Sequence, residues 1–352
     1  MMAPESYMTP ALGQALGGPA SVALPVTEQN HVGEARRRAM ALAHSAGLGE
    51  TERGTLAVIV TEAATNLARH ASDGVLVLRS VGMPPSGVEI LALDKGPGIR
   101  DLSKAMADGF STAGSAGHGL GAIRRMASEF DLFSAPETGT ALFARVNAMS
   151  GARETKADRG LTGVVCTPMD GERACGDAWA IHRSPSRALV VLADGLGHGF
   201  EAALAGELAI RTAMEPERRS PAQIIGAAHE ALRPTRGAAL AVAEIDADNH
   251  RLTFAGVGNV AAAVVAADAT KSLSSQNGIV GHEMRTAHEF IHPWTAASCL
   301  ILHSDGIRAR WQLGAYPGLV SHHPAVVAGT LFRDFSRGRD DATVIAVRMR
   351  AP

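Results

Sequence analysis

The feature that most constrains the fold of this chain is a change in the spacing of apolar residues at 148–160. Before this segment, apolar residues recur at helical spacing around a few strands, whereas after it short apolar strands follow one another. The segment itself, AMSGARETKADRG, is small and polar, as linkers between domains are. With roughly 100 to 200 residues per domain, 352 residues also predict two domains. We therefore expect domains at 21–147 and 161–352, joined by 148–160.

Composition narrows the class of protein. The chain is 46% apolar and 19% charged with a net charge of -2, which is typical of a globular protein and argues against a nucleic-acid partner. Its three cysteines are too few and too scattered for a disulfide framework. The first 35 residues contain no Lys or Arg, and no apolar run approaches the length of a membrane span. We expect a cytoplasmic protein with no membrane segment.

The first half predicts one α+β unit. Residues 1–20, rich in Gly, Pro and Ala without a period, are expected to form a disordered tail. Apolar residues at helical spacing then predict helices, and Gly- and Pro-rich turns separate the strands. The expected helices lie at 30–46, 52–71 and 119–130, and the expected strands at 21–26, 75–82, 88–94, 131–135 and 140–146.

The second half is dominated by short apolar strands. Helical patterns interrupt them only at about 201–213 and 221–232. Many strands with few helices favour sheets that pack on each other and are flanked by helices. The expected strands lie at 163–169, 178–183, 188–194, 238–246, 251–258, 261–268, 298–306 and 342–349.

One group of residues in the first half suits a nucleotide. Glu62 and Asn66 lie four residues apart on one face of a predicted helix, where a carboxylate can accept a hydroxyl proton and an amide oxygen can bind Mg²⁺. Asp94 ends an apolar strand just before Gly96 and Gly98, so its carboxylate can accept the exocyclic amine of adenine. Each pattern alone is also compatible with a solvated helix face or an ordinary turn.

Glycines crowd the segment before the next helix, FSTAGSAGHGLGAIRRM, at Gly114, Gly117, Gly119 and Gly121. Backbone amides at a helix N-terminus bind anions because their N–H groups and the helix dipole face the ligand. Glycines also form hinges, so the segment could instead be a lid. The ordered set of these elements predicts a phosphate-binding loop.

Residues 22–146 resemble the GHKL ATPase superfamily, and specifically the small serine kinases of the anti-sigma-factor and stressosome-switch type (RsbT/RsbW-like). The resemblance rests on TEAATN, DKGPGI, AMADGFSTAG, GHGLGAIRRMASEFD and TGTALFARV. It implies a GHKL (Bergerat) α/β sandwich that binds ATP with Mg²⁺ and phosphorylates a serine or threonine of a STAS-domain antagonist. The implied roles are Glu62 as catalytic base, Asn66 as Mg²⁺ ligand, Asp94 as adenine ligand, and Gly96, Gly98, Gly117, Gly119, Gly121 and Thr140 near the nucleotide.

A sensor histidine kinase would share this pocket. Such an enzyme needs a phosphoacceptor histidine on a separate dimerisation helix. His44 and His70 lack acidic neighbours of that kind and fall within the domain itself. We therefore rank this alternative below the serine kinase.

Acidic residues mark the strand ends of the second half: Asp177, Asp194, Asp305, and the pair Asp340 and Asp341. An Asp-Gly after a strand is usually only a turn. Several aspartates that converge can instead hold two Mg²⁺ or Mn²⁺ ions roughly 3.5 to 4 Å apart. Such a pair of ions activates a bridging water and clamps a phosphoryl group.

Residues 161–350 resemble the metal-dependent (PPM-type) serine/threonine phosphatases, in the SpoIIE/RsbX-like bacterial branch, with DGLGHG as the most specific motif. The resemblance implies an αββα sandwich in which Asp177 and Asp194, helped by the Gly195 carbonyl, bind the first ion. Asp305 and Asp340 hold the second, while Asp341 is a neighbour. His198 is interpreted as packing beside the metal centre.

Together these observations predict a phosphoserine/phosphothreonine phosphatase fused to a switch-kinase domain. Its partner would be a phosphorylated STAS-domain antagonist or stressosome protein, with a sigma factor as a further candidate. We expect dephosphorylation first, because the metal set is complete; the kinase half is either active or a nucleotide-gated docking module. The alternative is a non-catalytic, nucleotide-dependent regulator that sequesters its partner.

Overall fold

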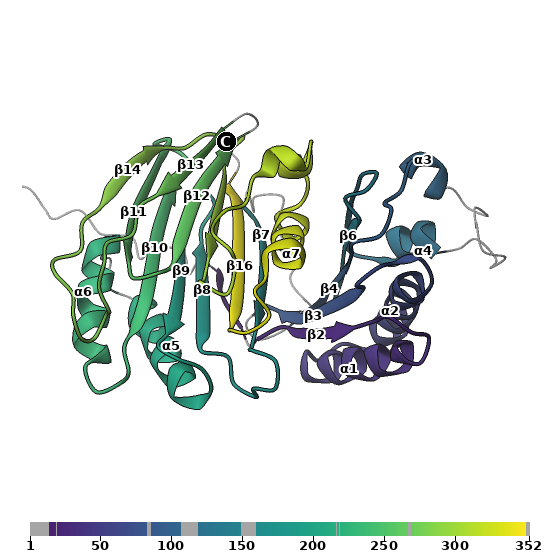
Figure 1. The fold of residues 1–352 in the computed structure, drawn as a ribbon, viewed down its shortest axis with the longest axis horizontal. Coiled ribbons are helices and arrows are strands. Elements are labelled where there is room, and N and C mark those ends of the chain that lie inside the picture. The colour runs from purple at the N-terminus through teal and green to yellow at the C-terminus, as the bar shows by residue number, and fades with distance from the viewer. Residues whose placement is uncertain are drawn as a thin grey trace, which may run out of the picture.

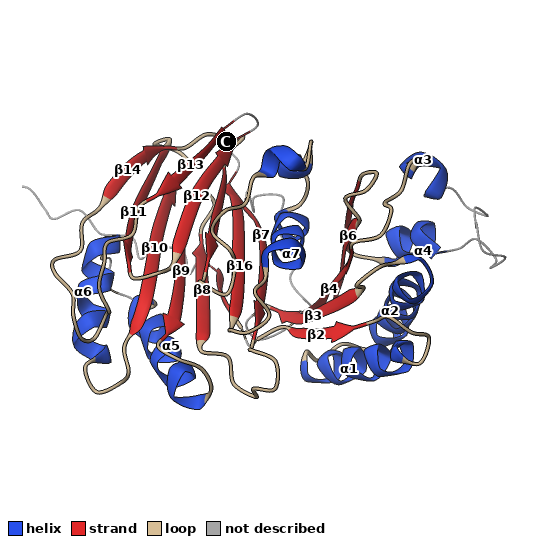
Figure 2. Ribbon diagram, viewed as in Figure 1, coloured by secondary structure: helices blue, strands red, loops and turns tan. Residues whose placement is uncertain are grey.

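The computed structural model describes residues 14–18, 20–82, 86–106, 119–148, 160–215, 217, 219–266 and 269–349. Within these ranges the strands form three sheets, one in the first domain and two in the second (Figures 1 and 2). No helix in the described part of the chain is long and apolar enough to cross a membrane. The expected linker lies outside the described residues except at its ends, because β6 ends at Asn147 and β7 begins at Gly160.

The first domain is an antiparallel five-stranded sheet covered by helices on one face. Its strand order is β2-β3-β4-β6-β5. Apolar side chains from the helices and from one face of the sheet form a single buried cluster. The elements are β2 (Val22–Pro25), α1 (His31–Ser45), α2 (Glu50–His70), β3 (Val75–Val81), β4 (Gly87–Asp94), α3 (Leu102–Ala105), α4 (Gly119–Met126), β5 (Glu129–Ser134) and β6 (Thr140–Asn147).

The second domain is a sandwich of two antiparallel sheets. A six-stranded sheet, β1-β8-β9-β10-β11-β14, faces a five-stranded sheet, β13-β12-β15-β16-β7, across a core of buried side chains. The first sheet comprises β1 (Gln14–Gly17), β8 (Asp177–Arg183), β9 (Arg187–Gly195), β10 (Ala238–Asp246), β11 (Arg251–Val257) and β14 (Phe290–Pro293). The second comprises β7 (Gly160–Thr167), β12 (Ala261–Ala266), β13 (Ala269–Leu273), β15 (Cys299–His303) and β16 (Ala342–Met349).

Helices cover both outer faces of the sandwich. The pair α5 (Phe200–Ala213) and α6 (Pro221–Leu232) packs on β9, β10 and β11. Helix α7 (Pro324–Phe335) packs on the other sheet, after the short 3-10 helices η1 (Leu313–Ala315) and η2 (Leu319–Ser321). This arrangement gives the αββα order expected for the second domain.

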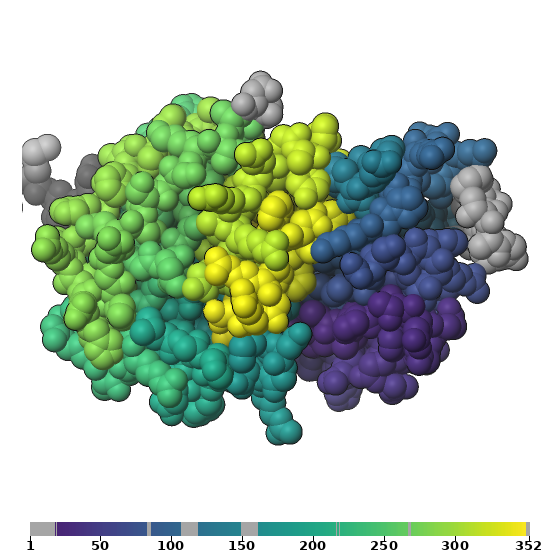
Figure 3. Space-filling model, viewed as in Figure 1, coloured from purple at the N-terminus to yellow at the C-terminus, as the bar shows by residue number. Residues whose placement is uncertain are grey.

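Helix α7 also joins the two domains. Every residue from Pro324 to Leu331 is buried. On one side these residues contact the second domain's sheet, and on the other they contact the face of the first domain's sheet that α1 and α2 leave open. Figure 3 shows the yellow C-terminal part of the chain packed between the green and the blue-purple parts. The molecule is therefore a continuous stack of layers with one apolar helix at its centre.

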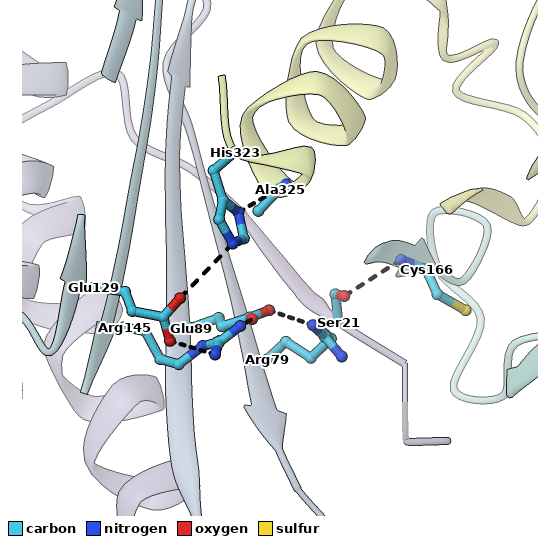
Figure 4. Close-up of polar contacts among 8 residues, drawn as sticks. All are labelled: Ser21, Arg79, Glu89, Glu129, Arg145, Cys166, His323 and Ala325. Atoms are coloured by element: carbon cyan, nitrogen blue, oxygen red, sulfur yellow. Dashed lines mark hydrogen bonds and ion pairs between the residues drawn. The ribbon is translucent and has the colours of Figure 1, made fainter. Parts of the chain in front are cut away.

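The prediction of a disordered tail is wrong for residues 14–17, which form β1. This strand pairs antiparallel with β8, with Gln14 opposite Arg183. Further along, the amide of Ser21 donates to the carbonyl of Cys166 in β7 at 2.5 Å, and the Ser21 hydroxyl accepts from the Cys166 amide (Figure 4). The pairing uses backbone groups at a sheet edge, which almost any sequence can supply. The tail prediction therefore missed it.

A buried polar cluster lies on the same open sheet face of the first domain. Glu89 on β4 is 4% exposed and pairs with Arg79 on β3 and Arg145 on β6, and Arg145 also pairs with Glu129 (Figure 4). Burial raises the pKa of Glu89, but the two guanidinium groups outweigh it and hold this pKa below its usual range. Arg79 lies 5.2 Å from the ring centre of Trp179 on β8, a cation–π contact between the domains.

We expect Glu89→Ala to lower the free energy of unfolding by about 3–5 kcal/mol, because it removes the carboxylate that two buried guanidinium groups share. Urea denaturation followed by tryptophan fluorescence measures the change. The matched control is Glu34→Ala, since Glu34 also bridges two arginines, Arg37 and Arg38, but at the surface. A loss no larger for Glu89→Ala than for the control would contradict a structural role of the buried cluster.

Candidate functional site

The structure brings the Glu62, Asn66 and Gly119 positions together. Helix α2 carries Glu62 and Asn66 one turn apart, and Gly119 begins α4 opposite them. A Cβ on Gly119 would lie 3.5 Å from Asn66 Nδ2 and 3.7 Å from Glu62 Oε2, which is ordinary van der Waals contact, so both side chains face the start of α4. Gly121, the third residue of α4, is buried. Gly117 and the expected lid lie outside the described residues.

Asp94 and Thr140 form the opposite end of this candidate nucleotide site. They are register partners at the ends of β4 and β6. The Gly96 amide donates to Asp94 Oδ1 at 2.7 Å, and the Thr140 hydroxyl lies 3.0 Å from the Ser134 hydroxyl. Burial raises the pKa of the Asp94 carboxyl, and the Gly96 amide opposes this rise. The carboxylate is therefore held by backbone in one orientation.

The two glycines after Asp94 are required by close contacts. Gly98 has a φ of +71°, and a Cβ there would lie 2.0 Å from the Ala135 carbonyl oxygen. A Cβ on Gly96 would lie 2.9 Å from Asp94 Oδ1 and 3.1 Å from the His70 carbonyl oxygen. The DKGPGI segment therefore packs tightly against the ends of α2 and β5.

The aspartates of the second half gather where the strands of its two sheets end. Asp177 and Asp194 are register partners on β8 and β9. The Ser304 hydroxyl, at the end of β15, donates to Asp177 Oδ2 at 2.7 Å and so joins the two sheets. Asp305 follows Ser304 directly, and the Thr343 amide donates to the Ser304 hydroxyl at 3.0 Å. This last contact brings the start of β16, just after Asp340, to the same place.

The electrostatics of this acidic cluster show that its carboxylates repel one another. Burial is the largest cause of a rise in the pKa of Asp194 to about 8. Burial also raises the pKa of Asp177 and of Asp305. The remaining rise at Asp194 comes from the neighbouring carboxylates Asp177, Asp305 and Asp340.

Two oxygens of the cluster are buried without a hydrogen-bond partner: Asp177 Oδ1 and Asp194 Oδ2. Unpartnered buried carboxylate oxygens are costly, and divalent cations relieve that cost. Among the described residues, no three His, Cys, Asp or Glu side chains already lie close enough together to hold one ion. Mg²⁺ keeps several waters and needs only one or two carboxylates, so the Asp177–Asp194 pair fits such an ion.

The adjacent residues Asp340 and Asp341 have different surroundings. Asp341 is buried and accepts from the amides of Met169 and Gly176, each at 2.8 Å. Both its oxygens therefore hold the loop that leads to Asp177. Asp340 accepts from the Asp341 amide at 3.0 Å and lies beside the Asp305 carboxyl, so it is the member of the pair that faces the other aspartates.

Some residues near the candidate metal ligands were not predicted from the sequence. Asn259, in the turn after β11, donates to Asp305 Oδ2 at 2.6 Å, and Ser304 contacts Asp177 as described. The GVGN turn at the end of a predicted strand could have suggested Asn259. Nothing local could have paired Ser304 with a residue of the other sheet. The His198 side chain, interpreted from the sequence as packing beside a metal centre, is exposed and contacts Glu172 Oε1 at 2.7 Å.

Comparisons with known proteins assign the two domains. Residues 25–146 match the family described as histidine kinase-like ATPase domain, and residues 184–350 match the family described as stage II sporulation protein E (SpoIIE). Over 107 residues the chain is 36% identical to the serine/threonine-protein kinase RsbT of Bacillus subtilis (strain 168), a match that covers 30% of this chain and 80% of RsbT.

One solved structure is similar to about half of the chain. It comes from work on the bacterial stressosome as a modular system adapted to control secondary messenger signaling. Its TM-score is 0.50 with 27% identity, over 54% of this chain and 99% of its own. The predicted resemblances and the two-domain fold are confirmed. The chain therefore belongs to the family of RsbT through its histidine kinase-like ATPase domain, and it fuses that domain to a SpoIIE-type phosphatase domain.

Proposed function

We propose that this protein is a metal-dependent phosphoserine/phosphothreonine phosphatase whose activity is coupled in one chain to an ATP-binding switch-kinase domain. The observation that carries the proposal is the acidic cluster. Asp177, Asp194 and Asp305 have raised pKa values, and two buried oxygens among them lack partners. A fold that concentrates unpaired carboxylates at strand ends favours cation binding over a purely structural role.

Asp177 and Asp194, with the Gly195 carbonyl, would hold the first Mn²⁺ or Mg²⁺, and Asp305 and Asp340 would hold the second. Bound there, the ions supply an activated water and neutralise the phosphoryl oxygens in an in-line displacement. The chain's own part is to fix the ligands. Ser304 orients Asp177, and Asn259 orients Asp305, each through the hydrogen bond described above.

In the first domain, ATP with Mg²⁺ would lie between α2, α4 and the ends of β4 and β6. Asn66 would bind the ion, Asp94 and Thr140 the adenine, and Glu62 would accept the substrate hydroxyl proton. Gly96, Gly98, Gly117, Gly119 and Gly121 would let the backbone approach the nucleotide closely. The convergence of Glu62 and Asn66 on Gly119 supports this arrangement.

The partner that fits both halves is a protein that carries a regulatory phosphate. A kinase-like domain similar to RsbT and a SpoIIE-type domain could add and remove phosphate on the same serine or threonine. We infer that a STAS-domain antagonist or stressosome protein is the substrate, with a sigma factor as a further candidate partner. The alternative, a non-catalytic regulator that binds its partner in a nucleotide-dependent way, differs by predicting no turnover.

We expect Mn²⁺-dependent hydrolysis of p-nitrophenyl phosphate by the full-length protein, and a loss of at least about 100-fold in Asp194→Asn because a metal ligand is removed. Asp246→Asn is the control, since Asp246 is also a carboxylate of this sheet but pairs with Arg187, at the opposite end of β9 from Asp194. The control should keep the wild-type rate. Wild-type protein that is inactive with both Mn²⁺ and Mg²⁺ favours the non-catalytic alternative.

The acidic cluster also predicts a pH dependence of stability. The Asp194 carboxyl has an unfolded pKa of about 3.9, and its folded pKa is about 8. The folded state therefore binds the extra proton, and stability should fall as pH rises from about 4 to about 8. We expect urea denaturation of EDTA-treated protein to show this fall. It should be smaller in Asp194→Asn, and added Mn²⁺ should reverse it in the wild type only.

Kinase activity is tested by transfer of the γ-phosphate of ATP to a purified STAS-domain protein. We expect Glu62→Gln to bind ATP like the wild type but to lose phosphotransfer by about 100-fold, because only the proton acceptor is removed. Glu52→Gln, on the first turn of the same helix, is the control and should keep full transfer. Nucleotide binding by the wild type without any transfer would instead identify the first domain as a docking module.

A further inference from the structure

Helix α7 of the phosphatase domain sends one side chain to the candidate nucleotide site of the other domain. The Arg333 side chain is only 2% exposed. Its Nη1 donates to the Asp94 carbonyl at 2.7 Å and to the Thr140 carbonyl at 3.3 Å. These are the backbone carbonyls of the two residues whose side chains would contact the adenine base.

The orientation of this guanidinium is fixed from its own domain. Arg333 Nε and Nη2 both donate to the carboxylate of Asp334, at 2.9 and 2.6 Å. The Tyr316 hydroxyl donates to the same carboxylate at 2.8 Å. With two nitrogens held in this way, the third is directed across the domain boundary.

The first-domain side of this contact, around Gly139, is also closely packed. Gly139, just before Thr140, has a φ of +73°, and a Cβ there would lie 2.0 Å from the Asp94 carbonyl oxygen and 2.9 Å from Arg333 Nη1. A side chain at this position would therefore displace either the strand end or the guanidinium. The ends of β4 and β6 and the Arg333 head group form one packed unit.

We infer that Arg333 is a positioning residue of the nucleotide site, supplied in cis by the phosphatase domain. By bridging the Asp94 and Thr140 carbonyls from the face opposite α2, it fixes the two strand ends whose side chains would contact adenine. It does not itself touch the base, so its effect is on the orientation of Asp94 and Thr140. This inference rests on the proposed ATP binding of the first domain.

A purely structural role makes a different prediction. If Arg333 only held the domains together, its loss would lower the affinity for every nucleotide by the same factor. If Arg333 positions Asp94 and Thr140, its loss should lower the affinity for adenine nucleotides selectively, because recognition of the base depends on those two side chains. The ratio of ATP to GTP affinity therefore separates the two roles.

The experiment is competition binding on full-length protein. A fluorescent ATP analogue with Mg²⁺ is displaced by unlabelled ATP or GTP. In Arg333→Met we expect ATP affinity to fall about tenfold, as for loss of a charge-assisted hydrogen bond, while GTP affinity changes less than about twofold. Arg333→Lys keeps the charge but has a single donor nitrogen in place of three, and should give an intermediate ATP affinity. It also tests the inference if Arg333→Met does not fold.

Asp131→Asn is the control from the same interface. Asp131 on β5 contacts His322 Nδ1 at 2.9 Å and accepts from the His323 amide, both in the phosphatase domain, without touching Asp94. It should leave the ATP to GTP ratio unchanged. Equal losses for both nucleotides in Arg333→Met, or the same loss of ratio in Asp131→Asn, would overturn the inference alone. Wild-type protein that binds neither nucleotide would overturn the proposed ATP binding as well.

Discussion

The burial of α7 between two sheets is the interaction on which the rest of the structure depends. An α-helix in a globular protein usually exposes a polar face, but Pro324–Leu331 has none. Such a helix is stable only if both sides are covered, and here one side is covered by each domain. The open face of the first domain's sheet carries the apolar side chains of Leu91, Leu93 and Phe143, which must also be covered from water. Each domain therefore removes from water a surface that the other would leave exposed.

This packing decides which surfaces the chain can offer to other proteins. The sheet of the first domain is covered on one face by α1 and α2 and on the other by α7, so neither face is free for a second sheet or another copy of the chain. Beyond α7, the Phe335 carbonyl accepts from the Arg308 amide and the Gly306 carbonyl accepts from the Arg337 amide. The segment that follows Arg333 thus lies against the loop that carries Asp305. The candidate nucleotide and metal sites share one structural element between them.

The sequence predicted those parts of the fold and site that depend on local pattern. Asp94 could be placed because an apolar strand ends there and glycines follow, and Glu62 and Asn66 because helical spacing puts them on one face. Helix α7 was missed because Pro324–Leu331 is a short, almost uninterrupted apolar run, which pattern alone does not assign to a helix rather than a strand. Strand β1 was missed because its pairing is by backbone alone. The Arg333 contact joins residues far apart in the chain and depends on how the domains pack, which no local pattern encodes.

The chain treats its buried carboxylates in two opposite ways. Glu89 is surrounded by Arg79 and Arg145, which lower its pKa, and it helps to hold a packed interface. Asp194 is surrounded by other carboxylates, which together with burial raise its pKa. A fold under selection for stability alone would pair both, because unpaired buried charge is costly. The acidic cluster is therefore a place where the structure gives up stability, as functional sites with unpaired groups commonly do, and this cost supports the proposed cation site.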